Sequence, residues 1–128
     1  ESLKNLKLRR AIIVNSEDGL DEISPYSNTN IVELNNGKIK NFILNPSDLN
    51  IKANSFDHIV GKDSAYNAEK IKEIFKGTDN DFSVAVCLNA AAGLLVADKS
   101  NSFSEAYKVL KEHILSGKVI NHISKLIK

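Results

Sequence analysis

The stretch that decides the fold reads Ala11-Ile12-Ile13-Val14-Asn15-Ser16-Glu17-Asp18-Gly19-Leu20-Asp21-Glu22-Ile23-Ser24. Its first four residues are apolar and mostly β-branched, which predicts a short buried strand. A polar, glycine-containing stretch ends this strand and places two adjacent carboxylates, Asp21 and Glu22, just past its carboxyl end. In open α/β sheets ligands bind at this edge, because the loops there vary while the strands hold them in place.

The two carboxylates can share one task only if the chain turns near them. Adjacent residues of a strand point to opposite faces, whereas Gly19 permits a turn because it adopts positive φ without a steric penalty. A close pair of carboxylates repels itself and is tolerated best beside a hard cation, and Mg²⁺ takes oxygen ligands of this kind. From the spacing alone two interpretations stay open: Asp21 and Glu22 hold Mg²⁺, or they form an acidic loop solvated by water.

Five motifs follow one another along the chain, and together they resemble the carboxyl-terminal half of anthranilate phosphoribosyltransferases. They are DGLDEIS at 18–24, LNPSDL at 44–49, GKDSAYNA at 61–68, CLNAAAGL at 87–94 and SGK at 116–118. They occur in the order and with nearly the spacing of that family. The chain departs from the pattern at Asn15-Ser16, where family members usually carry His-Gly, at Asn50, where a glycine is common, and at Lys62, in place of the second glycine of a pair.

The resemblance implies an α/β fold, a fragment of the nucleoside phosphorylase/phosphoribosyltransferase-type domain, with a strand and a β-hairpin followed by three to four helices. It also implies a reaction, the transfer of phosphoribosyl from phosphoribosyl pyrophosphate to anthranilate in tryptophan biosynthesis, with pyrophosphate as the leaving group. Asp21 and Glu22 match the family's acidic pair and would be ligands of Mg²⁺ held against that pyrophosphate. They would not need to transfer protons.

The family's phosphate-binding loop, Gly-Thr-Gly-Gly-Asp, does not occur in these 128 residues, and the six glycines lie far apart. We therefore expect residues 1–128 to be the carboxyl-terminal part of a single α/β domain, without the family's helical amino-terminal domain and inactive alone. The family's parallel sheet takes its other strands from upstream sequence. The sheet should therefore be incomplete, and uncovered edges and faces predict a homo-oligomer. Two alternatives stay open: a related enzyme of the pyrimidine-nucleoside phosphorylase type, and a non-catalytic binding module on the same scaffold.

The composition limits the classes of partner and the location that the chain suggests. There are 17 basic and 16 acidic residues, and a net charge of +1 gives no general attraction to nucleic acid or to a membrane surface. The single cysteine, Cys87, lies in an apolar run, which predicts a buried thiol and fits a reducing, cytoplasmic location. The longest apolar run, residues 84–97, is too short to span a bilayer and is interrupted by Asn89.

A hairpin is predicted around Asn36-Gly37, because both central residues of such a two-residue turn must adopt positive φ. The flanking strands, 31–34 and 38–43, then place Glu33 opposite Lys40 and Ile31 opposite Phe42, so that one face carries an ion pair and an apolar pair. Pro46 is expected to end the second strand.

Apolar periodicity predicts the helices. Asp63 should cap a helix that Gly77 closes, with an inward face made of Ala68, Ile71, Ile74 and Phe75. Residues 82–97 are apolar nearly all round and predict a central buried helix. Ser102 and Glu105 form a candidate capping box for a helix whose inward face is Phe103, Ala106, Leu110 and Ile114. A final amphipathic helix is expected after Gly117, with an apolar face of Val119, Ile120, Ile123 and Ile127.

Two kinds of polar side chain need an explanation. Asn89 lies inside an apolar helix and must find hydrogen-bond partners, so we expect it to tie that helix to a neighbouring loop. The histidines, His58, His113 and His122, are far apart in the sequence and show no metal-ligand spacing.

Overall fold

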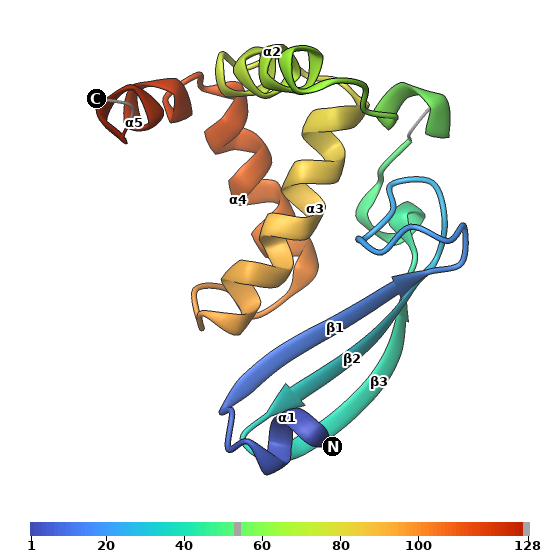
Figure 1. Ribbon diagram of the computed structural model, residues 1–128. Coiled ribbons are helices and arrows are strands. Elements are labelled where there is room, and N and C mark those ends of the chain that lie inside the picture. The colour runs from blue at the N-terminus through green and yellow to red at the C-terminus, as the bar shows by residue number, and fades with distance from the viewer. Residues whose placement is uncertain (53–54, 127–128) are drawn as a thin grey trace.

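In the computed structural model, which describes residues 1–52 and 55–126, a small antiparallel sheet is followed by helices (Figure 1). The strands are β1 (Arg10–Ser16), β2 (Thr29–Asn35) and β3 (Lys38–Leu44). The helices are α1 (Ser2–Asn5), α2 (Ser64–Phe75), α3 (Asp81–Val96), α4 (Phe103–Leu115) and α5 (Val119–Leu126), with short 3-10 helices η1 (Pro46–Leu49) and η2 (Phe56–Ile59) after the sheet. This order confirms the predicted α/β class.

The hairpin has the predicted register, but the Glu33 carboxylate forms its ion pair with Arg10, at 3.1 Å, and not with Lys40 as predicted. Ile31 pairs with Phe42 and Glu33 with Lys40, and the turn residues Asn36 and Gly37 have φ of 48° and 79°. β1 pairs antiparallel with β2, so the strand order among the described residues is β1-β2-β3. β1 and β3 are therefore the outer strands among the described residues, and all pairings there are antiparallel. That strands from upstream sequence complete the sheet stays a prediction.

The two faces of the sheet have different surroundings. One face packs on the helices, through Ile31, Leu44 and their neighbours, and the rings of Phe42 and Phe103 meet edge to face at 6.3 Å. On the other face, Ile13 is 53% exposed and Ile43 57%. The prediction of a short buried strand at 11–14 is thus wrong for Ile13, because α3 and α4 pack on the opposite face of the sheet.

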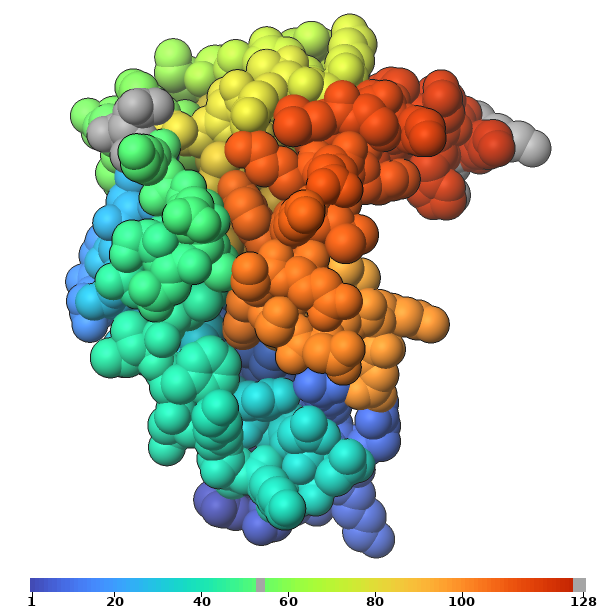
Figure 2. Space-filling view, turned by 180° about the vertical axis from the view of Figure 1, so that it is seen from behind, coloured from blue at the N-terminus to red at the C-terminus, as the bar shows by residue number. Residues whose placement is uncertain are grey.

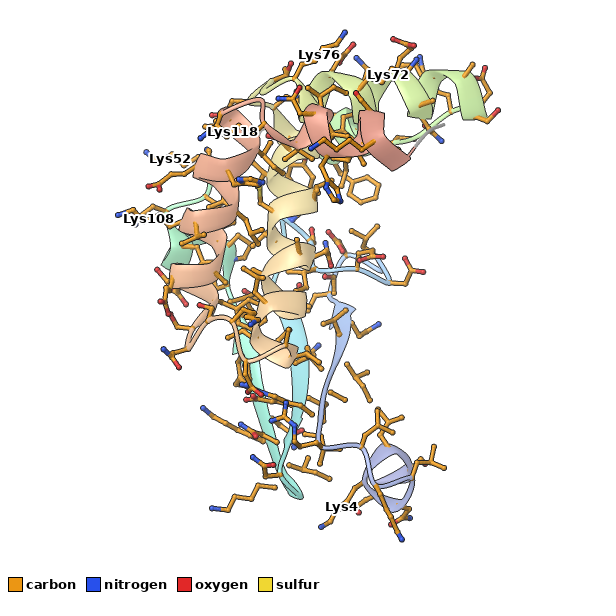
Figure 3. All side chains as sticks on the ribbon, turned by 90° about the vertical axis from the view of Figure 1, so that its left-hand side faces the viewer. Lys4, Lys52, Lys72, Lys76, Lys108 and Lys118 are labelled. Atoms are coloured by element: carbon orange, nitrogen blue, oxygen red, sulfur yellow. The ribbon has the colours of Figure 1, made fainter. Side chains whose placement is uncertain are left out.

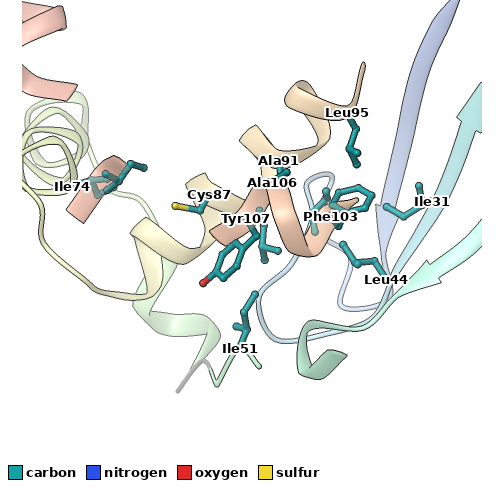
Figure 4. Packing of buried hydrophobic residues seen from close by; sticks show 13 residues of the cluster. Ile31, Leu44, Ile51, Ile74, Cys87, Ala91, Leu95, Phe103, Ala106 and Tyr107 are labelled. Atoms are coloured by element: carbon teal, nitrogen blue, oxygen red, sulfur yellow. The ribbon is translucent and has the colours of Figure 1, made fainter. Parts of the chain in front are cut away.

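The core lies between α3 and α4 and continues to the sheet (Figure 4). Ala91 of α3 and Ala106 of α4 have no exposed surface, and their small side chains let the two helices approach closely. Cys87 and Tyr107 pack in the same layer, and Leu95 lies where α3 meets the sheet. The predicted burial of Cys87, at 1% exposed, is confirmed.

The predicted inward faces are confirmed in part. In α2, Asp63 caps the helix by accepting a hydrogen bond from the backbone N–H of Tyr66 at 2.8 Å, and Ile74 is buried. Ala68 and Ile71 are exposed, contrary to prediction, because the helix packs mainly through its carboxyl-terminal end. α3 also has an exposed side, at Val86 and Gly93, and is therefore not buried all round.

Only one of the two hydrogen bonds of the capping box expected at α4 is present. Ser102 accepts from the backbone N–H of Glu105 at 3.2 Å, but the Glu105 carboxylate accepts from Asn101 N and Ser100 Oγ, both at 3.0 Å. A complete capping box occurs instead at α3, between Asn80 and Ser83.

The last helix, α5, extends away from the main body (Figure 2). Val119, Ile120 and Ile123 are half-buried, and Ile127 lies outside the described residues. No helix within residues 1–52 and 55–126 is long and apolar enough to cross a membrane.

Candidate functional site

The acidic pair lies in the connection between β1 and β2, residues 17–28, which we call the acidic loop. It follows the carboxyl end of β1, as predicted, and lies beside α3 (Figure 1). Gly19 has φ of 88°, so the turn that the sequence predicted is present. Asp21 and Glu22 are both exposed.

Three buried hydroxyl residues, Ser16, Ser24 and Thr29, hold the base of the acidic loop. Each is at most 2% exposed. Ser16 Oγ lies 2.6 Å from Thr29 Oγ1, donates to the backbone carbonyl of Glu22 at 2.8 Å and accepts from the Ser24 N–H at 3.1 Å. The main chain on both sides of Ile23 is thereby fixed to the end of the sheet. Ser16 occupies one of the positions at which the chain departs from the family pattern.

Asn89, in the middle of α3, holds the loop from the other side. Its Oδ1 accepts from the N–H of Ile23 at 2.8 Å, and its Nδ2 donates to the carbonyl of Ile23 at 3.1 Å and to that of Ala85 at 3.0 Å. The prediction that Asn89 ties its helix to a neighbouring loop is confirmed, and that loop carries the acidic pair.

The carboxylates of the acidic loop have separate tasks. Asp18 shapes the loop, since its Oδ2 accepts from Ser24 Oγ at 2.6 Å and its Oδ1 from the N–H of Leu20 at 3.2 Å. Glu17 accepts from Asn28 Nδ2 at 3.2 Å. Within residues 1–52 and 55–126, the carboxylates of Asp21 and Glu22 make no such hydrogen bond or ion pair.

Two free carboxylates on a fixed main chain are a suitable donor set for part of a Mg²⁺ site. Mg²⁺ is commonly bound by one or two carboxylates, with the other positions filled by water and substrate phosphates. The described part of the chain has no group of three or more His, Cys, Asp or Glu side chains that could hold a metal by itself. Asp21 and Glu22 would therefore form part of a metal site and not a complete one.

An apolar groove of about 430 Å³ opens next to Glu22. Its lining joins the acidic loop, η2 and α3, and consists of Leu20, Glu22, Ile59, Phe82, Ala85, Val86 and Asn89. The carboxylate of Glu22 therefore lies at the border between an apolar surface and the polar loop.

No sequence pattern predicts the second polar contact near the acidic loop. His58 Nδ1, on η2, lies 2.9 Å from Asp81 Oδ2 at the start of α3. Burial, together with the neighbouring Asp81 carboxylate, raises the pKa of Tyr26, which belongs to the acidic loop. The residues are separated by 23 positions or more in the sequence, and only the folded chain brings them together. His113 and His122 are exposed on α4 and α5.

Comparison with known proteins finds curated anthranilate phosphoribosyltransferases among the relatives of this chain. A curated anthranilate phosphoribosyltransferase of Pelagibacter ubique (strain HTCC1062) is 55% identical over 125 residues, which are 98% of this chain and 38% of the relative. The crystal structure of anthranilate phosphoribosyltransferase from Thermus thermophilus matches with a TM-score of 0.86 and 26% identity, covering 97% of this chain and 36% of that one. The chain thus spans under two fifths of the length of the proteins it matches.

A structure of anthranilate phosphoribosyltransferase from Saccharomyces cerevisiae in complex with phosphoribosyl pyrophosphate and Mg has the same fold. Its TM-score is 0.73 at 24% identity, over 86% of this chain and 32% of that one. The family model described as "Glycosyl transferase family, a/b domain" matches residues 1–120. Since this match covers nearly the whole sequence, the chain belongs to that glycosyl transferase family.

Proposed function

We propose that the chain is the carboxyl-terminal part of an anthranilate phosphoribosyltransferase and that Asp21 and Glu22 are its Mg²⁺ ligands. The observation that carries the proposal is the acidic loop: two exposed carboxylates stand on a main chain that is fixed by the buried hydroxyls and by Asn89. The names of the relatives support the reaction, and the structure of the Saccharomyces cerevisiae protein with phosphoribosyl pyrophosphate and Mg supports the metal.

The two carboxylates would act by binding and orienting. When bound, Mg²⁺ supplies positive charge that offsets the negative charge developing on departing pyrophosphate. Asp21 and Glu22 would hold the metal through their carboxylate oxygens and orient it toward the pyrophosphate. Because the hydrogen bonds of the loop are already formed, the ligands need little rearrangement when the substrate arrives.

The substrates in this proposal are phosphoribosyl pyrophosphate and anthranilate, and the reaction takes place in the cytoplasm. The chain lacks the family's glycine-rich phosphate loop, so the remaining contacts to the phosphates would come from the rest of the enzyme. Residues 1–128 alone are therefore expected to be inactive.

The test is an assay of the complete protein that contains this chain, with anthranilate and phosphoribosyl pyrophosphate, followed by the fluorescence change on product formation. We expect turnover that stops when the metal is chelated and returns with added Mg²⁺. The 128-residue chain alone should give none.

Two results would contradict the proposal. Absence of turnover by the complete protein, together with phosphorolysis of a pyrimidine nucleoside, would favour the related phosphorylase activity. Turnover by the isolated chain at the rate of the complete protein would show that the missing phosphate loop is not needed.

A further inference from the structure

Asn89 makes an unusual set of contacts for a residue in the middle of an apolar helix. Its amide pairs with both the N–H and the C=O of Ile23, at 2.8 and 3.1 Å. A neighbouring strand normally provides these two bonds to one residue. Here a single side chain from α3 provides them, 66 positions away in the sequence.

Because these contacts lie in a buried part of the chain, their loss would cost free energy. Ile23 is 1% exposed, so water cannot easily replace a missing partner of its main chain. Ile23 directly follows Glu22, and the carbonyl of Glu22 is held by Ser16 at 2.8 Å. The main chain that carries the acidic pair is therefore clamped between the end of the sheet and the middle of α3.

We infer that Asn89 is a positioning residue for metal binding, which fixes the directions in which Asp21 and Glu22 point. This inference rests on the proposed function. Asn89 does not need to touch the metal, because its effect passes through the main chain of Ile23. Residues that orient metal ligands in this way typically change metal affinity or activity about 10- to 100-fold when they are replaced.

The experiment uses the complete protein with Asn89→Leu, which keeps most of the volume and removes the amide, and with Asn89→Ala as a second variant. The matched control is Asn80→Ala, which removes the side-chain cap at the start of the same helix, where Asn80 accepts from Ser83 N at 3.0 Å, and leaves the loop contacts intact. Three quantities are measured: the Mg²⁺ concentration for half-maximal activity, Mn²⁺ affinity by electron paramagnetic resonance, and hydrogen exchange in residues 17–28.

We expect both Asn89 variants to raise the Mg²⁺ requirement and weaken Mn²⁺ binding by about 10-fold or more, with faster exchange in the acidic loop and little change in the KM for anthranilate. Asn80→Ala should lower the stability of the fold and leave metal binding near the wild-type value.

Unchanged metal binding in the Asn89 variants, or an equal shift in Asn80→Ala, would overturn the inference. A wild-type protein that binds Mn²⁺ but does not transfer phosphoribosyl would refute the proposed function while the Mn²⁺ comparison still decides the role of Asn89. A wild-type protein that binds no Mn²⁺ would overturn both.

Discussion

Burial decides the chemistry of the one thiol in the chain. Cys87 is 1% exposed between α3 and α4, and burial raises the pKa of its thiol to about 11. Burial likewise raises the pKa of Tyr107, on the facing helix, to about 12. The thiol of Cys87 is therefore part of the packing between α3 and α4.

These shifts predict a loss of stability at alkaline pH. The ordinary pKa of the thiol is 9.0, so between about pH 9 and 11 the unfolded chain releases this proton while the folded chain keeps it. The contribution is fully present below pH 9 and is lost as the pH rises through 11. Urea unfolding at about pH 8 and about pH 10.5, on either side of the ordinary pKa, measures it. Cys87→Ala should lose less stability over this range than the wild type, and equal losses would contradict the assignment.

For single residues, the sequence predicted that a buried polar side chain needs hydrogen bonds better than it predicted which groups provide them. An asparagine in an apolar helix needs hydrogen bonds, so a role for Asn89 as a tie to a loop could be predicted, but not its pairing with Ile23. The buried hydroxyl of Ser16 gave no signal, because serine is as common in exposed turns. The contact of His58 with Asp81 depends on where η2 docks on α3, which no local pattern states.

At the scale of elements, two glycines shape the junctions at which helices end. Gly77 follows α2 with φ of 101°, and Gly117 follows α4 with φ of 67°. A Cβ atom on Gly77 would lie 2.7 Å from the carbonyl oxygen of Leu115 at the end of α4. Gly77 is therefore needed both for its backbone conformation and for the close approach of the two helix ends.

Comparison of Gly77→Ala with Gly37→Ala separates these two requirements. Gly37, in the hairpin turn, has φ of 79° and no atom within 4 Å of the position of a Cβ. Gly37→Ala should lower the free energy of unfolding by about 1–2 kcal/mol, the cost of the left-handed conformation. Gly77→Ala should lower it further, because Leu115 must also move. If denaturant titrations gave the same loss of unfolding free energy for both variants, the contact with Leu115 would have relaxed without a cost in free energy.

Elements with strong local signals were predicted best. The hairpin register follows from Asn36-Gly37 and the alternation around it, which are local properties. The inward face of α2 was predicted only in part, since Ile71 has the same periodicity as Ile74 but is 49% exposed, whereas Ile74 is buried. Periodicity states which residues share a side of a helix, whereas packing decides how much of that side is covered.

At the scale of the whole molecule, both the charged side chains and the exposed apolar side chains are spread over several elements. The lysines labelled in Figure 3 lie at different ends of the molecule, and they are Lys4, Lys52, Lys72, Lys76, Lys108 and Lys118. Arg10 of β1 forms an ion pair with Glu33 inside the sheet, at 3.1 Å, and a second with Asp98, just after α3, which links the sheet to that helix. On the outward face of the sheet, Ile13 and Ile43 are both exposed.

This apolar face predicts that the isolated 128-residue chain self-associates. Replacing Ile13 and Ile43 together by Lys should shift the chain toward the monomer, because charged side chains on a sheet surface oppose face-to-face contact. Ile71→Lys is the matched control, since Ile71 is 49% exposed but lies on α2. Light scattering over a concentration series measures the effect. A wild-type chain that stays monomeric at high concentration would contradict the prediction.

The central claim, that the acidic pair holds Mg²⁺, is tested most directly by Mg²⁺ titration of the complete enzyme with Asp21→Asn and with Glu22→Gln. Each change removes one charge and one metal ligand from an exposed position, so stability should change little. We predict a higher Mg²⁺ requirement and a kcat lower by about 10²-fold or more. Glu17→Gln, in the same loop, is the control and should behave like the wild type. Titration curves for Asp21→Asn and Glu22→Gln that coincide with the wild-type curve would contradict the claim and leave the pair as a solvated turn.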